Sequence, residues 1–204
     1  MEQPRRYSAV VLAGGRAQRL GGVRKSSLVL DGVSLLDRSL RAVSGASHIV
    51  VVGDVVPTNM EVQVRFTREE PAYGGPVAGL FAGLAALPIL EEAAVVVAVD
   101  MPQVTADTVA RLLAGLPGAD ASVLGTDHAH LAAALWTRPL LAARPEEPDG
   151  YAWRRLLARL QTRKIPVAGE EDHDVDTWAD LPSGQPCDGP RFRRIWVGEP
   201  PRLD

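Results

Sequence analysis

Near its N-terminus the chain reads Val10-Val11-Leu12-Ala13-Gly14-Gly15-Arg16-Ala17-Gln18-Arg19-Leu20-Gly21-Gly22-Val23-Arg24-Lys25. An apolar run leads here into a loop rich in glycine and in basic side chains. Glycine tolerates positive φ and lets the backbone approach a ligand closely, so successive N–H groups can point at phosphate oxygens. The segment therefore predicts a strand whose carboxyl end presents an anion-binding loop. Arg19 and Lys25 are its candidate catalytic cations.

This loop differs from two better-known phosphate-binding loops. It lacks the Gly-Lys-Ser/Thr ending of a P-loop and the G-x-G-x-x-G dinucleotide fingerprint. A glycine-rich turn that only closes a tight strand-to-helix connection is the alternative. The arginines argue against that alternative, and so does Lys25, because the chain has only one other lysine, Lys164.

Beyond this loop, strand-like and helix-like patterns alternate along the chain. Short apolar runs predict strands at residues 7–13, 47–53, 61–66, 93–99, 119–125, 131–136 and 163–167. Apolar periodicity predicts helices at residues 34–43, 76–87, 105–116 and 151–161, and a short last helix from residue 177. This alternation predicts a single-domain, doubly wound α/β fold with a mostly parallel sheet and helices on both faces. The domain is expected to span residues 1–182, followed by a tail rich in Pro, Gly and Arg over residues 183–204.

Composition excludes several classes of protein. A net charge of −3 argues against a broad basic surface for nucleic acid. No apolar run approaches the roughly 20 residues that a membrane-spanning helix needs. The single cysteine, Cys187, cannot form an intrachain disulfide and has no ligand cluster around it. The start of the chain has no signal-type apolar segment, so a cytoplasmic location is expected.

A second informative block is Val99-Asp100-Met101-Pro102, directly after a valine-rich run. The carboxylate of Asp100 is expected to emerge at the carboxyl end of a buried strand, which is where ligands bind in open α/β sheets. The alternative is that Asp100 only caps the helix expected near residue 105. On the first interpretation, Asp100 lies at the same sheet edge as the glycine-rich loop.

Two further blocks are rich in glycine or in acidic residues. Glu69-Glu70-Pro71-Ala72-Tyr73-Gly74-Gly75-Pro76-Val77-Ala78-Gly79 ends in a glycine pair and a proline that start a helix, whose free N–H groups can meet an anion or a base edge. His173-Asp174-Val175-Asp176 places two carboxylates two residues apart, on one side of an extended backbone. Asp176 could instead serve as an N-cap for the last helix.

Taken in their order along the chain, the blocks resemble the nucleotidyltransferase signature, and most closely that of the molybdenum cofactor guanylyltransferases. The resemblance spans residues 8–181 and implies a Rossmann-like fold of the nucleotide-diphospho-sugar transferase type. It implies transfer of GMP from Mg-GTP to the terminal phosphate of molybdopterin, or of its molybdenum-loaded form, with release of pyrophosphate. The implied cofactor is Mg²⁺, and the implied partners are GTP, molybdopterin and, further on, molybdoenzymes or other proteins of cofactor synthesis.

The same resemblance suggests roles for individual residues. Nucleotide binding falls to Leu12, Ala13, Gly14, Gly15, Lys25, Glu69, Glu70, Gly75, Pro76, Gly79 and Asp100. Magnesium ligation falls to Asp100 and Asp176, and the pterin side to Asp174, Arg154 and Arg155, although a solvated helix face explains the two arginines equally well. The chain departs from the family pattern where Trp178 replaces a commoner proline, where Asp-x-Asp replaces Asn-x-Asn, and where Val52-Gly53 replaces an asparagine.

Two rival functions remain open at this point. The first loop and Asp100 would serve any nucleoside triphosphate, so a nucleotidyltransferase that uses CTP or a sugar phosphate is one rival. A non-catalytic module that delivers the cofactor is the other, and the presence of both Lys25 and Asp100 speaks against it.

Overall fold

A computed structural model describes residues 2–15, 25–126, 128–176 and 180. Within them, the central feature is a seven-stranded sheet with the strand order β5-β4-β1-β6-β8-β7-β9. Its strands are β1 (Tyr7–Leu12), β4 (His48–Val52), β5 (Val64–Thr67), β6 (Ala93–Ala98), β7 (Ala121–Leu124), β8 (Ala132–Trp136) and β9 (Thr162–Ile165). In this described sheet every strand except β8 runs in the same direction, which confirms the expected mostly parallel sheet.

Strands β1 and β6 lie at the centre of the sheet because their sequences are apolar throughout. All six residues of β6 are buried, and five of the six in β1 are buried. Such continuous apolar runs suit a parallel strand that is covered on both faces. β1 pairs with β4 on one side and with β6 on the other, and all three strands end at the same edge of the sheet.

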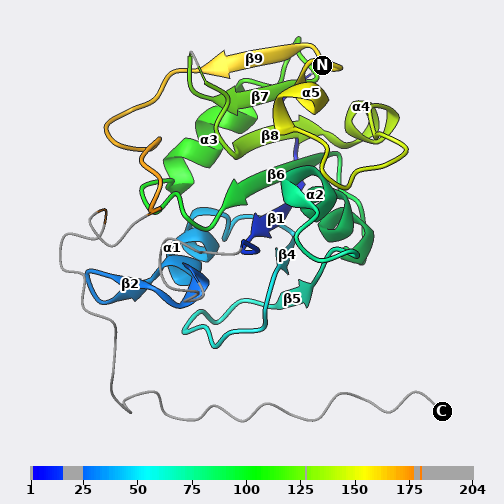
Figure 1. Cartoon of the computed structure of the whole chain (residues 1–204). Coiled ribbons are helices and arrows are strands. Elements are labelled where there is room, and N and C mark those ends of the chain that lie inside the picture. The colour runs from blue at the N-terminus through cyan, green and yellow to red at the C-terminus, as the bar shows by residue number, and fades with distance from the viewer. Residues whose placement is uncertain (1, 16–24, 127, 177–179, 181–204) are drawn as a thin grey trace.

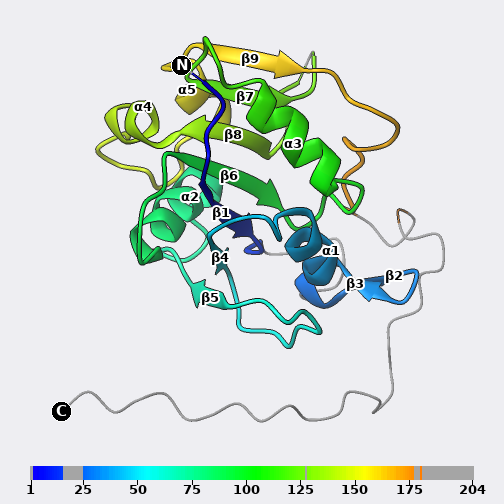
Figure 2. The ribbon, with the colours of Figure 1, turned by 180° about the vertical axis from the view of Figure 1, so that it is seen from behind.

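Helices cover both faces, as expected from the alternating pattern. They are α1 (Leu35–Ala42), α2 (Gly75–Ala86), α3 (Ala106–Ala114), α4 (Thr137–Ala142) and α5 (Trp153–Leu157). Figures 1 and 2 show α1 and α3 on one side of the sheet, and α2, α4 and α5 on the other. Because side chains alternate along a strand, Ala9 and Val11 join the core under α1 and α3, whereas Val10 and Leu12 join the core under α2, α4 and α5.

Helix α2 packs very closely on the sheet, and its glycines permit this approach. A Cβ atom added at Gly83 would lie 2.5 Å from Cγ1 of Val10, and one added at Gly79 would lie 3.1 Å from Cδ2 of Leu12. The N-terminus of α2 thereby lies directly over the carboxyl end of β1.

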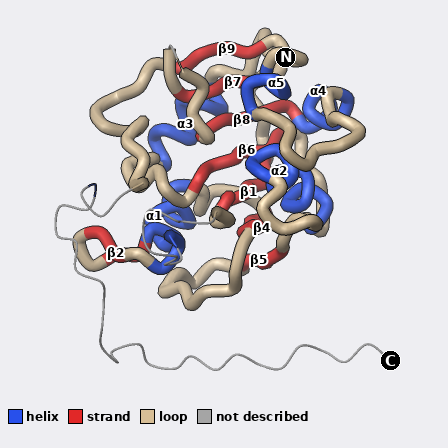
Figure 3. Tube along the Cα trace, viewed as in Figure 1, coloured by secondary structure: helices blue, strands red, loops and turns tan. Residues whose placement is uncertain are grey.

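Figure 3 shows the helices and strands of the structure, and several of them differ from the sequence prediction. The strand expected at residues 61–66 is β5, displaced toward residue 67, and the helix expected at 151–161 is the shorter α5. Helix α4 and the small hairpin of β2 (Val29–Leu30) and β3 (Val33–Ser34) were not predicted, because elements this short carry little periodicity. The expected last helix and the tail over 183–204 fall almost entirely outside the described residues, so the predicted domain division stays a prediction. Among the described helices, none has the length and apolar character needed to cross a membrane.

Candidate nucleotide-binding site

A cavity of about 320 Å³ opens at the edge of the sheet where β1, β4 and β6 end. After β1 the chain adds β4 and β5 on one side of β1, and it then returns to add β6 on the other side. The strand order therefore reverses at this point, which is where ligands usually bind in doubly wound folds. Its volume lies within the range of small-molecule sites. The lining residues are Leu12, Gly14, Gly15, Lys25, Val52, Glu69, Tyr73, Gly75, Pro76, Gly79, Ala98, Val99, Asp100 and Leu131.

Charged groups meet at this cavity from three distant parts of the chain. Nζ of Lys25 donates hydrogen bonds to Oδ2 of Asp100 at 2.9 Å and to Oδ1 of Asp176 at 2.7 Å. Lys25 begins a short 3₁₀ helix (Lys25–Ser27), and Asp100 directly follows β6 and its adjoining residue Val99. One ammonium group is thus held between two carboxylates.

The environment shifts the pKa of Lys25 and the pKa of Asp174, which lies nearby. Burial lowers the pKa of Lys25, but the hydrogen bonds from its ammonium group to Asp100 and Asp176 outweigh burial and raise the pKa above its ordinary value. The pKa of the Asp174 carboxyl is raised, first by partial desolvation and then by the negative charge of Asp100, although the Asp174 residue as a whole is exposed. Lys25 is therefore held in its protonated form. Asp174 lies beside Asp100 and Asp176, the two carboxylates that hold Lys25.

The acidic pair Asp174 and Asp176 is held in place by the residue between them. Val175 is fully buried, and its backbone N–H donates to the carbonyl oxygen of Asp100 at 2.8 Å. With Val175 turned into the core, both flanking carboxylates come close to Asp100 and to the ammonium group that Asp100 holds.

A second wall of the cavity comes from the segment that leads into α2. Glu69 is buried and its Oε1 accepts a hydrogen bond from the backbone N–H of Tyr73 at 3.1 Å. The peptide bond between Glu70 and Pro71 is cis. Tyr73 has a positive φ of 66° and remains 56% exposed at the cavity, while Pro76 occupies the first turn of α2. The free N–H groups of this helix start therefore adjoin the cavity.

The first loop crosses very near β4, and Gly53 makes that possible. A Cβ atom added at Gly53 would lie 2.9 Å from the carbonyl carbon of Ala13. The backbone N–H of Ala13 donates to the carbonyl oxygen of Val52 at 2.9 Å, which fixes where the loop leaves the sheet. The residues that replace the expected asparagine thus serve close packing of this loop.

Most of the residues predicted to bind the nucleotide lie together. Nine of them line the cavity, namely Leu12, Gly14, Gly15, Lys25, Glu69, Gly75, Pro76, Gly79 and Asp100, and Ala13 lines the adjoining depression. Glu70 is exposed and does not line the cavity, so of the two acidic candidates Glu69 is the one in position. Arg154 and Arg155 are exposed on α5 and do not line it either, and Arg19 falls outside the described residues.

Sequence reasoning missed several cavity residues. Val52, Ala98, Val99 and Leu131 line it because β4 and β6 end, and β8 begins, at this edge. Leu131 could not be anticipated without knowing that β8 runs antiparallel. Tyr73 offered a signal, since it directly precedes the glycine pair at the start of α2.

The donors present suit a hard divalent cation. Asp100 and Asp176 direct carboxylate oxygens at one point, where the ammonium of Lys25 is the cation they hold. Mg²⁺ is typically bound by one or two carboxylates together with substrate phosphates and water. The described residues contain no cluster of three or more His, Cys, Asp or Glu able to hold a metal by themselves, so substrate oxygens or water would complete the coordination of a metal here.

Comparison with known proteins identifies the family. A family model described as the MobA-like NTP transferase domain matches residues 9–165. The chain belongs to this family. Its membership confirms the expected nucleotidyltransferase family, and the match ends before the segment that carries Asp174 and Asp176.

Relatives of this MobA-like chain carry consistent names. A molybdenum cofactor guanylyltransferase from Acidiphilium cryptum is 35% identical over 193 residues, which cover 87% of the chain and 93% of that protein. Another protein of that name, from Rhizobium johnstonii, is 37% identical over 142 residues, which cover 66% of the chain and 65% of that protein.

Solved structures share the fold of this MobA-like chain. A homologue, from Mycobacterium sp. strain JC1, of the Mycobacterium tuberculosis protein rv0371c is 26% identical, with a TM-score of 0.67 over 85% of this chain and 92% of that one. Molybdopterin-guanine dinucleotide biosynthesis protein A from Archaeoglobus fulgidus is 23% identical, with a TM-score of 0.63 over 85% and 94%. A cytidylyltransferase for 2-C-methyl-D-erythritol 4-phosphate from Thermus thermophilus is 16% identical, with a TM-score of 0.64 over 86% and 95%. The fold is therefore shared by enzymes with different substrates, and the fold alone does not select the base.

Proposed function

We propose that this protein transfers GMP from Mg-GTP to the terminal phosphate of molybdopterin, or of its molybdenum-loaded form, and releases pyrophosphate. The names of the curated relatives support the substrate pair. The observation that carries the proposal is the meeting of Lys25 and Asp100 at a cavity walled by the first glycine loop and the start of α2. A cation, a carboxylate and free backbone N–H groups are the elements that nucleotidyl transfer needs.

Positioning and charge neutralisation carry this reaction, because the acceptor phosphate itself supplies the attacking oxygen. In the proposal, Lys25 turns from the two carboxylates to the triphosphate and stabilises the charge that develops on it. The N–H groups around Gly14 and Gly15 would bind the phosphates, and Asp100 and Asp176 would hold the metal. Bound Mg²⁺ would supply Lewis-acid stabilisation of the phosphate oxygens.

The base is assigned to the other wall of the cavity. Leu12, Val52 and Leu131 present apolar surface there, and Tyr73 offers an aromatic ring at the mouth. The carboxylate of Glu69 can only accept hydrogen bonds when it is ionised, so it suits donor groups on the nucleotide. Guanine presents N–H donors on its Watson–Crick edge, which agrees with the guanine assignment.

The acceptor is assigned to the side of Asp174. Partial desolvation and neighbouring negative charge raise the pKa of the Asp174 carboxyl, and a divalent cation held by Asp100 and Asp176 would offset that negative charge. Arg154 and Arg155 on α5 stay predictions for the pterin side. The reaction is expected in the cytoplasm, where GTP is available, and delivery of the product to molybdoenzymes or other cofactor-synthesis proteins stays a prediction.

The test compares nucleotides and then adds the acceptor. Thermal shift with Mg-GTP should exceed the shifts with Mg-CTP, Mg-UTP and Mg-ATP at equal concentration, since a ligand that binds the native state stabilises it. Adding molybdopterin to the GTP sample should then release pyrophosphate. Preferential stabilisation by CTP would overturn the guanine assignment. Tight binding of GTP without pyrophosphate release would instead favour a cofactor carrier.

A further inference from the structure

The acidic pair beside the cavity reaches its position through a segment that follows β9 at the far end of the sheet. We name residues 166–176 the strap, and Figure 1 shows it leaving β9 and returning along α3 toward the end of β6. It has no strand or helix hydrogen bonding of its own. Ordering each residue costs about 1–2 kcal/mol of backbone entropy, so a segment without regular structure needs several contacts to stay in place. At its C-terminal end the strap is held by the burial of Val175, by the hydrogen bond from Val175 to Asp100 and by the contact of Lys25 with Asp176. A further anchor lies nearer its middle.

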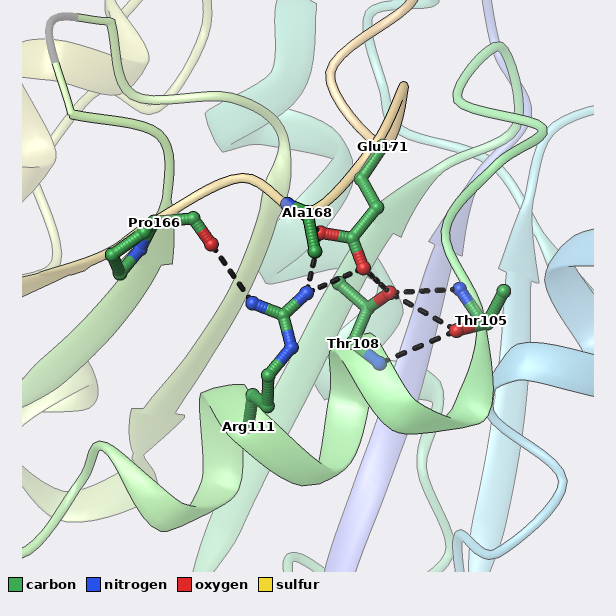
Figure 4. Close-up of polar contacts among 6 residues, drawn as sticks. All are labelled: Thr105, Thr108, Arg111, Pro166, Ala168 and Glu171. Carbon is green, nitrogen blue, oxygen red and sulfur yellow. Dashed lines mark hydrogen bonds and ion pairs between the residues drawn. The ribbon is translucent and has the colours of Figure 1, made fainter.

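That anchor is the buried carboxylate of Glu171. Both of its oxygens accept hydrogen bonds from Nη2 of Arg111 on α3, Oε1 also accepts one from the hydroxyl of Thr108, and Oε2 accepts the backbone N–H of Ala168 at 2.8 Å (Figure 4). Nη1 of Arg111 donates to the carbonyl oxygen of Pro166 at 2.8 Å. The Glu171 side chain is only 9% exposed. These contacts fold the strap on itself and fasten it to one helix.

The helix end that receives Glu171 is itself capped by side chains. The hydroxyl of Thr105 accepts the backbone N–H of Thr108, and the hydroxyl of Thr108 accepts the backbone N–H of Thr105 at 3.0 Å, so the two residues form a capping box. The first turn of α3 also favours negative charge. Burial raises the pKa of Glu171, but the hydrogen bonds from Arg111, Thr108 and Ala168 outweigh it and lower the pKa below its ordinary value. The carboxylate is therefore held in its charged form.

Both anchors of the strap lie on one continuous piece of the chain. Asp100 accepts the hydrogen bond from Val175, and only a few residues later Thr105 and Thr108 begin α3 and receive Glu171. The strap is therefore bound at two points to the β6–α3 connection and the first turn of α3, and this same connection carries Asp100. Asp176 is placed relative to Asp100 by this shared support.

We propose that Glu171 is a positioning residue, which acts through the strap to hold Asp176 opposite Asp100 so that the two carboxylates can share one metal ion. The inference rests on the proposed function, because the metal arrives with the nucleotide. Glu171 does not line the cavity, so it is not expected to contact the nucleotide itself.

The test measures GTP binding by calorimetry with Mg²⁺ and again with EDTA, in the wild type and in E171Q. We expect E171Q to reduce the ratio of the two affinities roughly three- to tenfold, which lies within the range for residues that modulate a site without touching its ligand. GTP binding in EDTA should not change. E170Q is the matched control, because it neutralises an exposed glutamate one residue earlier and should keep the wild-type ratio.

A double variant decides whether Glu171 acts through Asp176. The ratio in E171Q/D176N should equal that in D176N alone, because Asp176 is then no longer there to be positioned. A further loss in the double variant, or a wild-type ratio in E171Q, would overturn the inference. If the wild type bound no GTP under either condition, the proposed function would fail instead, so the two failures can be told apart.

Discussion

Replacing Lys25 by methionine should have opposite effects on catalysis and on metal binding. The ammonium of Lys25 lies 2.9 Å from Asp100 and 2.7 Å from Asp176, in the position of a cation between two carboxylates. In the proposed reaction the same group turns to the triphosphate. K25M keeps a long, flexible side chain but removes the charge, so the triphosphate loses a contact while a metal ion loses a competitor.

The magnitude follows from the contacts. A hydrogen bond to a charged group contributes about 1.5–3 kcal/mol, which corresponds to roughly ten- to a hundredfold in turnover. For metal binding without nucleotide, the lower end applies, because Asp176 is 53% exposed and water screens it. K25M should therefore bind Mn²⁺ alone about tenfold more tightly than the wild type does.

Two assays check this prediction. Pyrophosphate release with GTP and molybdopterin measures turnover, and the paramagnetic resonance signal of free Mn²⁺ measures metal binding in the absence of nucleotide. K164M is the control, because Lys164 is exposed on β9, far along the sheet from β1, and bonds the carbonyl oxygen of Thr126. Unchanged turnover in K25M, or weaker Mn²⁺ binding than in the wild type, would refute the role assigned to Lys25.

Three further predictions concern other parts of the molecule. Y73A should weaken Mg-GTP binding by about 1–3 kcal/mol in calorimetry if the ring stacks on the base, and Y73F should bind normally; equal binding by Y73A would exclude stacking. G83A should lower the free energy of unfolding in urea by about 1–3 kcal/mol, because its Cβ would lie 2.5 Å from Cγ1 of Val10, and an unchanged midpoint would show that α2 can shift outward. Because the pKa of Glu171 is lowered by folding, its stabilising effect should be complete above about pH 4.5 and should be lost as the pH falls through the lower folded value. Acid titrations of stability should therefore be steeper for the wild type than for E171Q, and parallel curves would contradict this.

Much of the fold was predictable because it depends on local patterns. Short continuous apolar runs rich in valine, such as β6, favour covered strands, and the alternation of strands with helices favours crossover connections between mostly parallel strands. Once the strands are parallel, their carboxyl ends meet at one edge. Lys25 and Asp100 could therefore be assigned to one site, because each follows the carboxyl end of a strand-like run.

The acidic residues illustrate the limit of such reasoning. The sequence left Glu69 and Glu70 as equal candidates. Only the structure shows that Glu69 is buried and accepts the backbone N–H of Tyr73, whereas Glu70 is exposed. Likewise, nothing local distinguishes Glu171 from the acidic residues around it. Its importance depends on Arg111 and Thr108, which lie some sixty positions earlier.

The sequence by itself determined the strand and helix pattern, the doubly wound fold and the loop that would meet Asp100, because apolar periodicity, glycine and the edge rule for parallel strands act over short stretches of chain. The tertiary structure decided the antiparallel course of β8 that brings Leu131 to the cavity. It also decided the contact of Lys25 with Asp176, and the anchoring of the strap by Glu171. These features depend on which distant side chains come within hydrogen-bonding reach, and that is set by the packing of the whole chain rather than by any segment of it.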